Sequence, residues 1–406
     1  MSTMVDDPRV IASAAGLRGT LAGYRARIAR GDIGQLPVLI GLVVIWLVFY
    51  VASGGTFVSP FNLVNLALQM AAVGTIAVGV VFVLLLGEID LTVGIVSGLC
   101  AGIMAVLNVK MGVPGPVAVG AGVVSGTVIG LAQGVWITRF RIPSFVVTLA
   151  GLIGWQGALL YVLGNTGTIN LRDPFITAVA GTFFTGAVAV LIGAALVAYL
   201  IGTSYLERSR RLRAGLTAET MGALFVRSAV IAAFVAGALV VLTQDRGLPL
   251  SLVSLVALIL VMDHVARRTR FGRMVFAVGG NREAARRAGI PVQAVRVAVF
   301  ALASTCAAWG GVLAASRLLA VNQSAGSGDI LLDAIAAAVI GGTSLFGGRG
   351  TVWAALLGIL VIQSISNGMD LLSLDSSVKF MITGAVLLVA VTIDAIARRG
   401  RERAGA

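Results

Sequence analysis

Long runs of apolar residues recur along almost the whole chain and constrain its fold more than any other feature. Of the 406 residues, 58% are hydrophobic and only 12% are charged, and the mean hydropathy is +1.01. A soluble domain carries far more charge on its surface, so this composition is typical of a polytopic membrane protein. Only helices or closed barrels satisfy all backbone polar groups in lipid, and barrel strands would alternate apolar and polar residues. The runs are continuous, so we expect an all-α fold.

The runs predict about 12 membrane-spanning helices, a ten-helix core with two inserted spans. They are expected near residues 37–53, 61–86, 91–107, 116–138, 143–163, 174–202, 226–243, 248–266, 294–319, 330–346, 351–371 and 378–395. The 61–86 run is long for a single crossing and carries Asn62, Asn65 and Gln69 at helical spacing, followed by glycines. We therefore expect a broken or re-entrant helix there, with its polar stripe facing protein or water.

Basic residues are distributed unevenly over the connections between these spans. The net charge is +13, and most arginines fall on one face of the membrane once the spans are placed. The cations on or toward the other face are Lys110, Arg172, Arg246, Arg317 and Lys379. This asymmetry follows the positive-inside rule and predicts that both termini are cytoplasmic. The charge therefore reports topology, and we expect no nucleic-acid partner.

The spans divide the chain into a membrane domain with two cytoplasmic ends. We expect a cytoplasmic N-terminal segment over 1–35, a transmembrane domain over 36–396 and a cytoplasmic tail over 397–406. Within the domain, 174–243 is interpreted as an inserted helix pair whose basic loop, 203–225, is cytoplasmic. Glycines inside the spans, as in the ladder of Gly120, Gly122, Gly126 and Gly130, predict close helix packing.

A strongly basic, helix-prone segment lies between two spans, over residues 267–296. Asn281 can cap a helix that starts there, Gly289 can end it, and Pro291 forbids its continuation. An arginine-rich helix kept in so apolar a chain is most simply a surface on which another protein acts. The alternative is a solvated loop helix without a partner.

Glu88 and Asp90 lie in the very short segment that joins two spans. Carboxylates near the hydrocarbon region are costly unless paired or hydrated, which makes both candidates for function. One interpretation is a gate, with Asp90 as N-cap of the following helix. The other is a proton site of a secondary transporter. The pattern favours capping.

Neutral polar residues recur in the second half of the chain. A polar cluster runs from Asn322 to Asp329, and Asp333 follows it at the start of the 330–346 span, whose glycine-rich end should break the helix. Gln363 and Asn367 recur at helical spacing on the next span. Such a lining suits a hydroxylated, uncharged solute, although for each residue taken singly interhelical hydrogen bonding is the favoured interpretation. The candidates for a translocation path or gate are Asn65, Gln69, Glu88, Asp90, Asn322, Asp333, Gln363 and Asn367.

Several motifs of enzymes and cofactor proteins do not occur in the sequence. Neither Lys110 nor Lys379 follows a glycine-rich phosphate loop, so there is no Walker A motif. His264 is the single histidine, and no Cys/His cluster could hold a metal. We therefore expect no catalytic residues, no metal and no cofactor, and any energy for uphill transport must come from another protein.

With these segments in view, the chain resembles the monosaccharide permeases of the ribose/xylose/galactose class of bacterial ABC importers. The resemblance is ordered along most of residues 36–396, and the extra spans near 174–243 make it most similar to the xylose-type members. It rests on residues 62–69, 88–94, 142–151, 279–290, 332–348 and 367–369.

The resemblance implies a homodimer in the bacterial inner membrane, joined to two cytoplasmic ATPase subunits and one extracytoplasmic sugar-binding protein. It also implies a coupling helix that docks on the ATPase, formed by Gly280, Asn281, Arg282, Glu283, Ala284, Ala285, Arg286 and Gly289. The expected function is import of a monosaccharide, xylose first, driven by the partner ATPase. A proton-coupled secondary sugar transporter that uses Glu88 and Asp90 is the alternative, and a channel or scaffold is a third.

Overall fold

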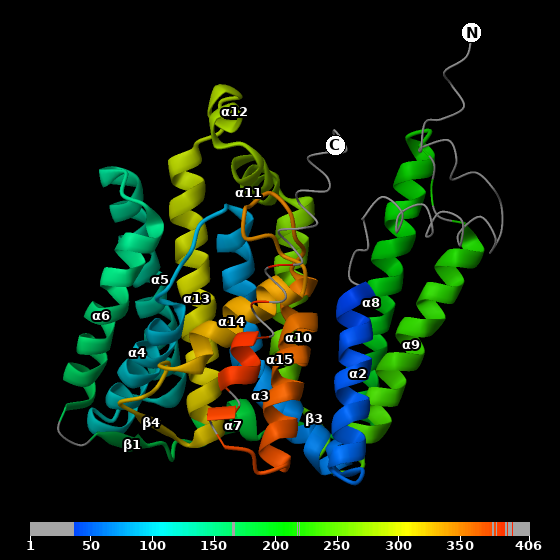
Figure 1. Cartoon of the computed structure of the whole chain (residues 1–406), viewed down its shortest axis with the longest axis horizontal. Coiled ribbons are helices and arrows are strands. Elements are labelled where there is room, and N and C mark those ends of the chain that lie inside the picture. Colours follow the sequence, from blue (N-terminus) through cyan, green and yellow to red (C-terminus); the bar gives the residue numbers. More distant parts are fainter. Residues whose placement is uncertain are drawn as a thin grey trace. The chain divides into compact units, whose positions relative to one another are not determined.

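The computed structural model describes residues 36–375 apart from 165, 166, 217 and 219, and then 377, 378, 380–385, 388 and 392. Nine helices in this part of the chain are long and apolar enough to cross a membrane, and the strands are two or three residues long (Figure 1). The predicted all-α polytopic fold is confirmed. The predicted cytoplasmic segments 1–35 and 397–406 lie outside the described residues, as does much of the predicted span 378–395.

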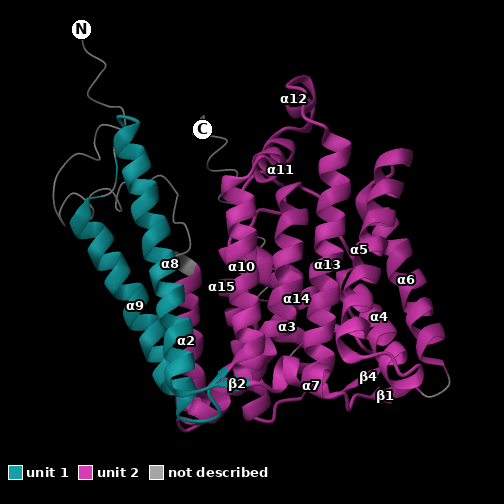
Figure 2. Ribbon diagram, turned by 180° about the vertical axis from the view of Figure 1, so that it is seen from behind, with its two compact units in different colours: residues 1–34, 183–248, 397–406 teal, residues 35–182, 249–396 magenta. Residues whose placement is uncertain are grey.

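The chain divides into two compact units (Figure 2). Among the described residues, the larger unit comprises 36–182 and those from 249 onward, and the smaller comprises those within 183–248. The elements of the larger unit are α2 (Leu36–Ala52), η2 (Thr56–Val58), α3 (Pro60–Leu85), α4 (Val93–Ala105), the π-helical turn η3 (Val106–Lys110), α5 (Gly115–Phe140), α6 (Ser144–Leu163), β1 (Thr168–Asn170), α7 (Pro174–Gly181), α10 (Leu250–Arg268), α11 (Arg270–Gly280), α12 (Arg282–Arg287), α13 (Val292–Leu318), β4 (Ala320–Asn322), α14 (Asp329–Ile340) and α15 (Trp353–Leu371).

Helices α3 and α13 form the centre of the larger unit. Helix α3 is buried along nearly its whole length and packs on α10, α13, α14 and α15, while α13 also packs on α4 and α5. Helix α3 is continuous, so the predicted break was wrong. Gly79 instead allows α3 to approach α13 closely, because a Cβ at this position would collide with the backbone of Ala303. Asn62 faces protein, as expected of the polar stripe, and is buried.

The glycines of α5 bring this helix against its neighbours. A Cβ at Gly122 would meet the carbonyl oxygen of Cys100 on α4, and one at Gly130 would meet that of Phe300 on α13. Small residues allow such close approach of helix backbones. The predicted close packing is confirmed for Gly122, Gly126 and Gly130, but it was wrong for Gly120, where a Cβ would have open space around it.

Helix α14 is shorter than the span predicted over 330–346. It ends at Ile340, and Gly342 has a φ of 103°, a left-handed conformation that favours glycine. Its 12 residues extend only about 18 Å, well short of a hydrocarbon core about 30 Å thick. The expectation that the glycine-rich end breaks this helix is confirmed.

The smaller unit contains β2 (Phe183–Phe184), α8 (Gly186–Arg213) and α9 (Met221–Thr243), and β3 (Leu248–Pro249) lies at its boundary. The prediction of a single span over 174–202 was wrong. Helix α7 ends at Gly181, the next residue, Thr182, is extended, and α8 starts only at Gly186. Helix α8 also continues into the predicted loop 203–225 as far as Arg213. The ion pair between Glu207 and Arg211 spans one helical turn there and favours helix.

Candidate functional site

The basic segment forms the helix that its capping residues predict. Asn281 Oδ1 accepts a hydrogen bond from the Ala284 N–H at 2.9 Å, which makes Asn281 the N-cap of α12. Gly289 follows the helix with a φ of 80°, and Pro291 is the N-cap of α13. Helix α12 lies at one end of the larger unit, beyond the ends of the long helices (Figure 1).

Most side chains of α12 are exposed. Ala285 alone of the α12 residues is buried, so a single small side chain of this helix packs against the rest of the larger unit. Glu283 pairs with Arg286 at 3.6 Å and with Arg287 at 3.4 Å, and all three are at least 60% exposed. Exposed pairs of this kind contribute little to stability, about 0 to 1 kcal/mol. These charges are therefore available to a partner at low cost.

Glu88 joins the short segment between α3 and α4 to two arginines from distant elements. Its Oε1 accepts a hydrogen bond from Nη2 of Arg282 on α12 and lies 2.8 Å from Nη2 of Arg296 on α13. Glu88 is only 5% exposed and Arg296 11%, whereas Arg282 is 44% exposed. A buried carboxylate needs such partners, because an unpaired charge in this position is strongly destabilising.

Sequence reasoning singled out Glu88 and Arg282 for different roles and did not select Arg296 at all. The structure brings these three residues together. The signal for Arg296 was present, since it is a lone charge in the first two turns of a span, and ionisable residues in such positions are usually paired or functional.

A cavity of about 1080 Å³ opens beside Glu88. It lies between the Gly87–Ile89 segment, the turn that joins α5 to α6, and the α12–α13 connection. Four arginines line it, together with the single carboxylate of Glu88: Arg141, Arg282, Arg286 and Arg296. Movement of α12 would therefore change the shape and charge of this cavity directly.

Asp90 is buried and does not cap α4, so the capping prediction was wrong. Its Oδ1 accepts hydrogen bonds from the N–H and the hydroxyl of Thr92, at 2.8 and 2.6 Å, and Thr92 itself holds the N-cap position. The carboxylate is thus engaged one residue before the helix starts. Burial raises the pKa of the Asp90 carboxyl, and the two hydrogen bonds from Thr92 oppose that rise.

Thr92 extends this contact to α5. Its Oγ1 lies 3.2 Å from the side-chain amide of Gln133, which is buried. The Thr92 hydroxyl has one hydrogen, and the closer Asp90 takes it, so the Gln133 amide is best satisfied with its N–H turned toward Thr92. On the other side, the Ser144 hydroxyl at the start of α6 accepts from the Ile89 N–H at 3.4 Å. The segment from Gly87 to Thr92 therefore contacts α5, α6, α12 and α13.

Two of the predicted polar residues meet in the interior. Asn62 Nδ2 on α3 donates to Oδ1 of Asn367 on α15 at 2.7 Å and to the Phe57 carbonyl at 2.8 Å. The predicted path residues do not form one cluster. Asn65 and Gln69 are half-buried on α3, Gln363 is buried on α15, Asp333 is half-buried on α14, and Asn322 is exposed at the end of β4.

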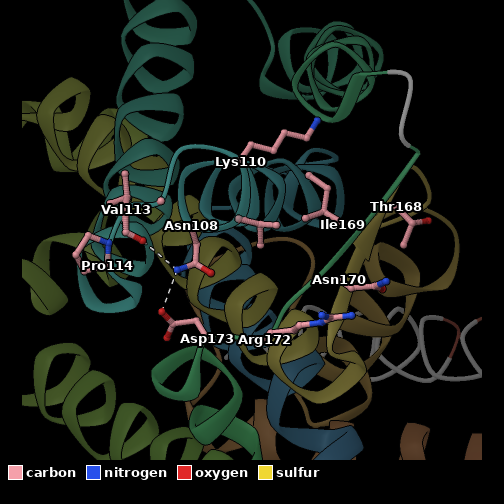
Figure 3. Close-up of a pocket in the computed structure, with 11 residues that line it drawn as sticks. Asn108, Lys110, Val113, Pro114, Thr168, Ile169, Asn170, Arg172 and Asp173 are labelled. Carbon is pink, nitrogen blue, oxygen red and sulfur yellow. Dashed lines mark hydrogen bonds between the residues drawn. The ribbon is translucent and has the colours of Figure 1, made fainter.

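A second cavity, of about 690 Å³, lies at the end of the larger unit opposite α12 (Figures 1 and 3). Its centre is Asn108, in the π-helical turn, whose Nδ2 donates to Val113 O and to Asp173 Oδ2 at 3.0 Å each. Asp173 Oδ1 also caps α7 by accepting from the Phe175 and Ile176 N–H groups. Sequence reasoning missed this cavity, although an Asp followed by Pro174 is a signal for a helix start.

The pKa of Asp173 reflects these contacts. Partial burial raises it, but the hydrogen bonds from Asn108 and from backbone N–H groups outweigh that effect and place the pKa of Asp173 below its ordinary value. The carboxylate is therefore charged over the whole physiological range, next to Arg172 and Lys110 in the same cavity lining.

Comparison with known families places this geometry in context. The family described as the branched-chain amino acid transport system permease component matches residues 62–391. The chain belongs to this permease family. It is 36% identical over 366 residues, 90% of this chain and 93% of the relative, to the xylose transport system permease protein XylH of Escherichia coli K12.

Other relatives are permeases with different sugars in their names. The chain is 31% identical to the L-arabinose ABC transporter permease protein AraH of Azospirillum brasilense, over 93% of each chain. It is also 31% identical to the ribose import permease protein RbsC of Bacillus subtilis, over 90% of this chain and 94% of the relative. No solved structure matches the chain. The resemblance to sugar ABC permeases is confirmed, and the chain is a multi-pass protein of the bacterial inner membrane.

Proposed function

We propose that this permease is the membrane subunit of an ATP-driven monosaccharide importer and that its substrate is D-xylose. The relative with xylose in its name shares 36% identity, against 31% for the arabinose and ribose relatives. Two copies would form the translocation path, with two ATPase subunits on the cytoplasmic side and a sugar-binding protein on the other. The Asn and Gln residues among the path candidates would suit a polyhydroxylated, uncharged solute, because their side-chain amides both donate and accept hydrogen bonds.

The single observation that supports coupling to an ATPase is the geometry of α12. This helix stands beyond the long helices, exposes Glu283, Arg286 and Arg287, and is seated by one buried alanine. Such a helix offers a charged, capped surface to a partner without exposing the apolar core. The excess of arginine predicts an acidic groove on the ATPase.

Co-purification and transport test this proposal together. The permease, extracted from its native membrane, should carry with it a protein that has a Walker A motif. Proteoliposomes that hold the complete complex should then take up labelled xylose only with ATP inside and binding protein outside. Uptake by the permease alone, without nucleotide, would contradict the proposal.

Substitutions on α12 test the surface itself. Glu283→Ala combined with Arg286→Ala should abolish xylose uptake while the dimer stays folded, because the side chains removed are exposed and make only weak contacts in the permease. Glu207→Gln with Arg211→Gln, which removes an equally exposed pair on α8, is the matched control. Normal uptake by the α12 variant would disprove the role of this helix.

Proton coupling through Glu88 and Asp90 is the weaker alternative. Both Arg282 and Arg296 already pair with the Glu88 carboxylate, so this side chain is engaged in holding elements of the permease together. Asp90 Oδ1 already accepts two hydrogen bonds from Thr92. A transporter of that kind would accumulate sugar from a pH gradient alone, which the uptake experiment measures directly.

A further inference from the structure

The ion pair between Glu88 and Arg282 connects α12 to the interior of the larger unit. Arg282 is the first residue of α12 and is 44% exposed, while Arg296 on α13 is only 11% exposed. One of the two partners of Glu88 is therefore fixed in the helix bundle, and the other sits on the element that faces outward. A displacement of α12 changes only one of the two contacts.

We propose that Glu88 receives the movement of α12 through Arg282 and passes it to the segment Gly87–Thr92, with Arg296 as the fixed partner. This inference rests on the proposed function, because it assigns the residues that transmit the force of the ATPase. When α12 moves away, Glu88 keeps Arg296 as its partner, so the carboxylate is never left buried without a cation. Glu88 can therefore be paired with both arginines or with Arg296 alone, and neither arrangement leaves a buried charge without a partner. A switch requires two such accessible arrangements.

The segment Gly87–Thr92 is bonded to two helices that a movement of Glu88 would affect. Ile89 is held at its N–H by Ser144 of α6, and Asp90 and Thr92 connect to Gln133 of α5. Shifting Glu88 by the length of one hydrogen bond therefore acts on α5 and α6 at once. Both helices border the cavity beside Glu88, through Thr138 and Phe145.

A close glycine contact holds the end of α3 that precedes this segment. A Cβ at Gly279, at the end of α11, would collide with the carbonyl oxygen of Leu85 and with Gly348 N, and Gly348 donates to the same carbonyl at 2.8 Å. The C-terminus of α3 is thus clamped between α11 and the α14–α15 connection. Glu88, three residues later, is the first side chain of the connection to α4 that binds α12.

Transport stoichiometry in the assembled complex tests this proposal. The permease, its ATPase and sugar-loaded binding protein are reconstituted in proteoliposomes, and the sugar moved per ATP hydrolysed is measured for Glu88→Gln, Glu88→Asp, Arg282→Gln and the Glu88→Gln/Arg282→Gln double variant. We expect Glu88→Gln and Arg282→Gln each to lower the ratio about tenfold, a typical size for coupling between sites. ATP hydrolysis and co-purification of the ATPase are measured for every variant and should persist in Glu88→Gln, which leaves α12 itself unchanged, and Glu88→Asp should recover most of the ratio.

The double variant separates transmission from a structural effect. If both side chains act through one contact, its ratio should be no lower than that of the worse single variant, whereas independent effects would multiply. Glu207→Gln, in an exposed pair on α8, is the control and should keep the wild-type ratio. Should Glu88→Gln fail to fold, the half-exposed Arg282→Gln decides the question by the same ratio.

Two results would overturn the proposal: a wild-type ratio in Arg282→Gln or in Glu88→Gln, or a double variant whose loss is the product of the single losses. Failure of the proposed function is distinguishable from either. In that case the wild-type permease itself would bind no ATPase and show no ATP-dependent uptake.

Discussion

Arg282 Nη2 donates to Glu88 Oε1 across 194 positions of sequence. The pair joins the first residue of α12 to the connection between α3 and α4, and Arg296 of α13 completes it. Because Glu88 and Arg296 are both nearly inaccessible, the cluster contributes to stability as well as to any movement of α12. Because solvent weakens an exposed ion pair, Arg296, the less exposed of the two arginines, should contribute more than Arg282.

Arg296→Gln should lower the free energy of unfolding by about 2 kcal/mol, because it removes the less exposed partner of Glu88 and leaves the carboxylate with Arg282 alone. Arg211→Gln removes an arginine from an exposed pair and should change stability by less than about 0.5 kcal/mol. Thermal unfolding of both variants in the same detergent checks the difference. Equal unfolding temperatures would mean that Glu88 does not need Arg296.

Gly279→Ala should destabilise the protein, because the added Cβ would collide with Leu85 O and Gly348 N at the end of α11. Forcing a methyl group into such a contact costs about 1–3 kcal/mol. Gly280→Ala is the matched control, since a Cβ at this neighbouring position has open space around it, and should be neutral or stabilise by up to about 1 kcal/mol. The same loss in both variants would show that helix propensity matters here and the contact does not.

Local signals predicted the elements whose ends are defined by their own residues. Asn281, Gly289 and Pro291 act on their immediate neighbours, so the sequence predicted α12 at both ends. The break in α3 was predicted wrongly for a related reason. Its glycines and Asn62 looked like weaknesses of one helix, whereas Ala303 and Asn367, far away in sequence, fill those positions in space.

The candidate site was predicted in parts but not as a whole. Glu88 and Arg282 each stood out by their chemistry, yet nothing local links residues that are 194 positions apart. Asp90 shows the limit of a local rule, because a carboxylate before a helix usually caps it. Here the N–H and hydroxyl of Thr92 take the carboxylate first. The cavity around Asn108 was missed because its lining combines the π-helical turn with β1, a strand far along the sequence.

Asp173→Ala should lower the free energy of unfolding by about 1 kcal/mol, the usual effect of losing a helix N-cap. Asp173→Asn keeps a capping oxygen but not the charge. The pKa of Asp173 in the folded protein lies below its ordinary value, so folding favours the charged form. The stability that this charge contributes is fully present at pH values above the ordinary pKa, and it is lost as the pH falls through the pKa of the folded protein. Unfolding temperatures recorded from about pH 6 down to about pH 3 should therefore fall more steeply for the wild type than for Asp173→Asn. Parallel curves would exclude a contribution from the charge.

Comparison of the wild type with Asp90→Asn should show a pH dependence of stability opposite to that expected for Asp173. Burial raises the folded pKa of Asp90 above its ordinary value, so folding favours the protonated form. The stability linked to this group is complete below the ordinary value and is lost as the pH rises through the raised pKa. Relative to Asp90→Asn, the wild type should therefore lose stability as the pH rises across that interval, which unfolding temperatures in detergent measure.

The same substitution also separates the two modes of energy supply. The side-chain carbonyl of the Asp90→Asn variant would still accept from the N–H and hydroxyl of Thr92, so the connection to α4 should keep its shape. ATP-driven uptake of xylose should then persist at a rate within about threefold of the wild type, a barrier change below about 1 kcal/mol. A proton site cannot work without an ionisable group. If Asp90→Asn abolished uptake while the complex still hydrolysed ATP and bound its partners, Asp90 would have a role in moving the sugar that its contacts with Thr92 do not explain.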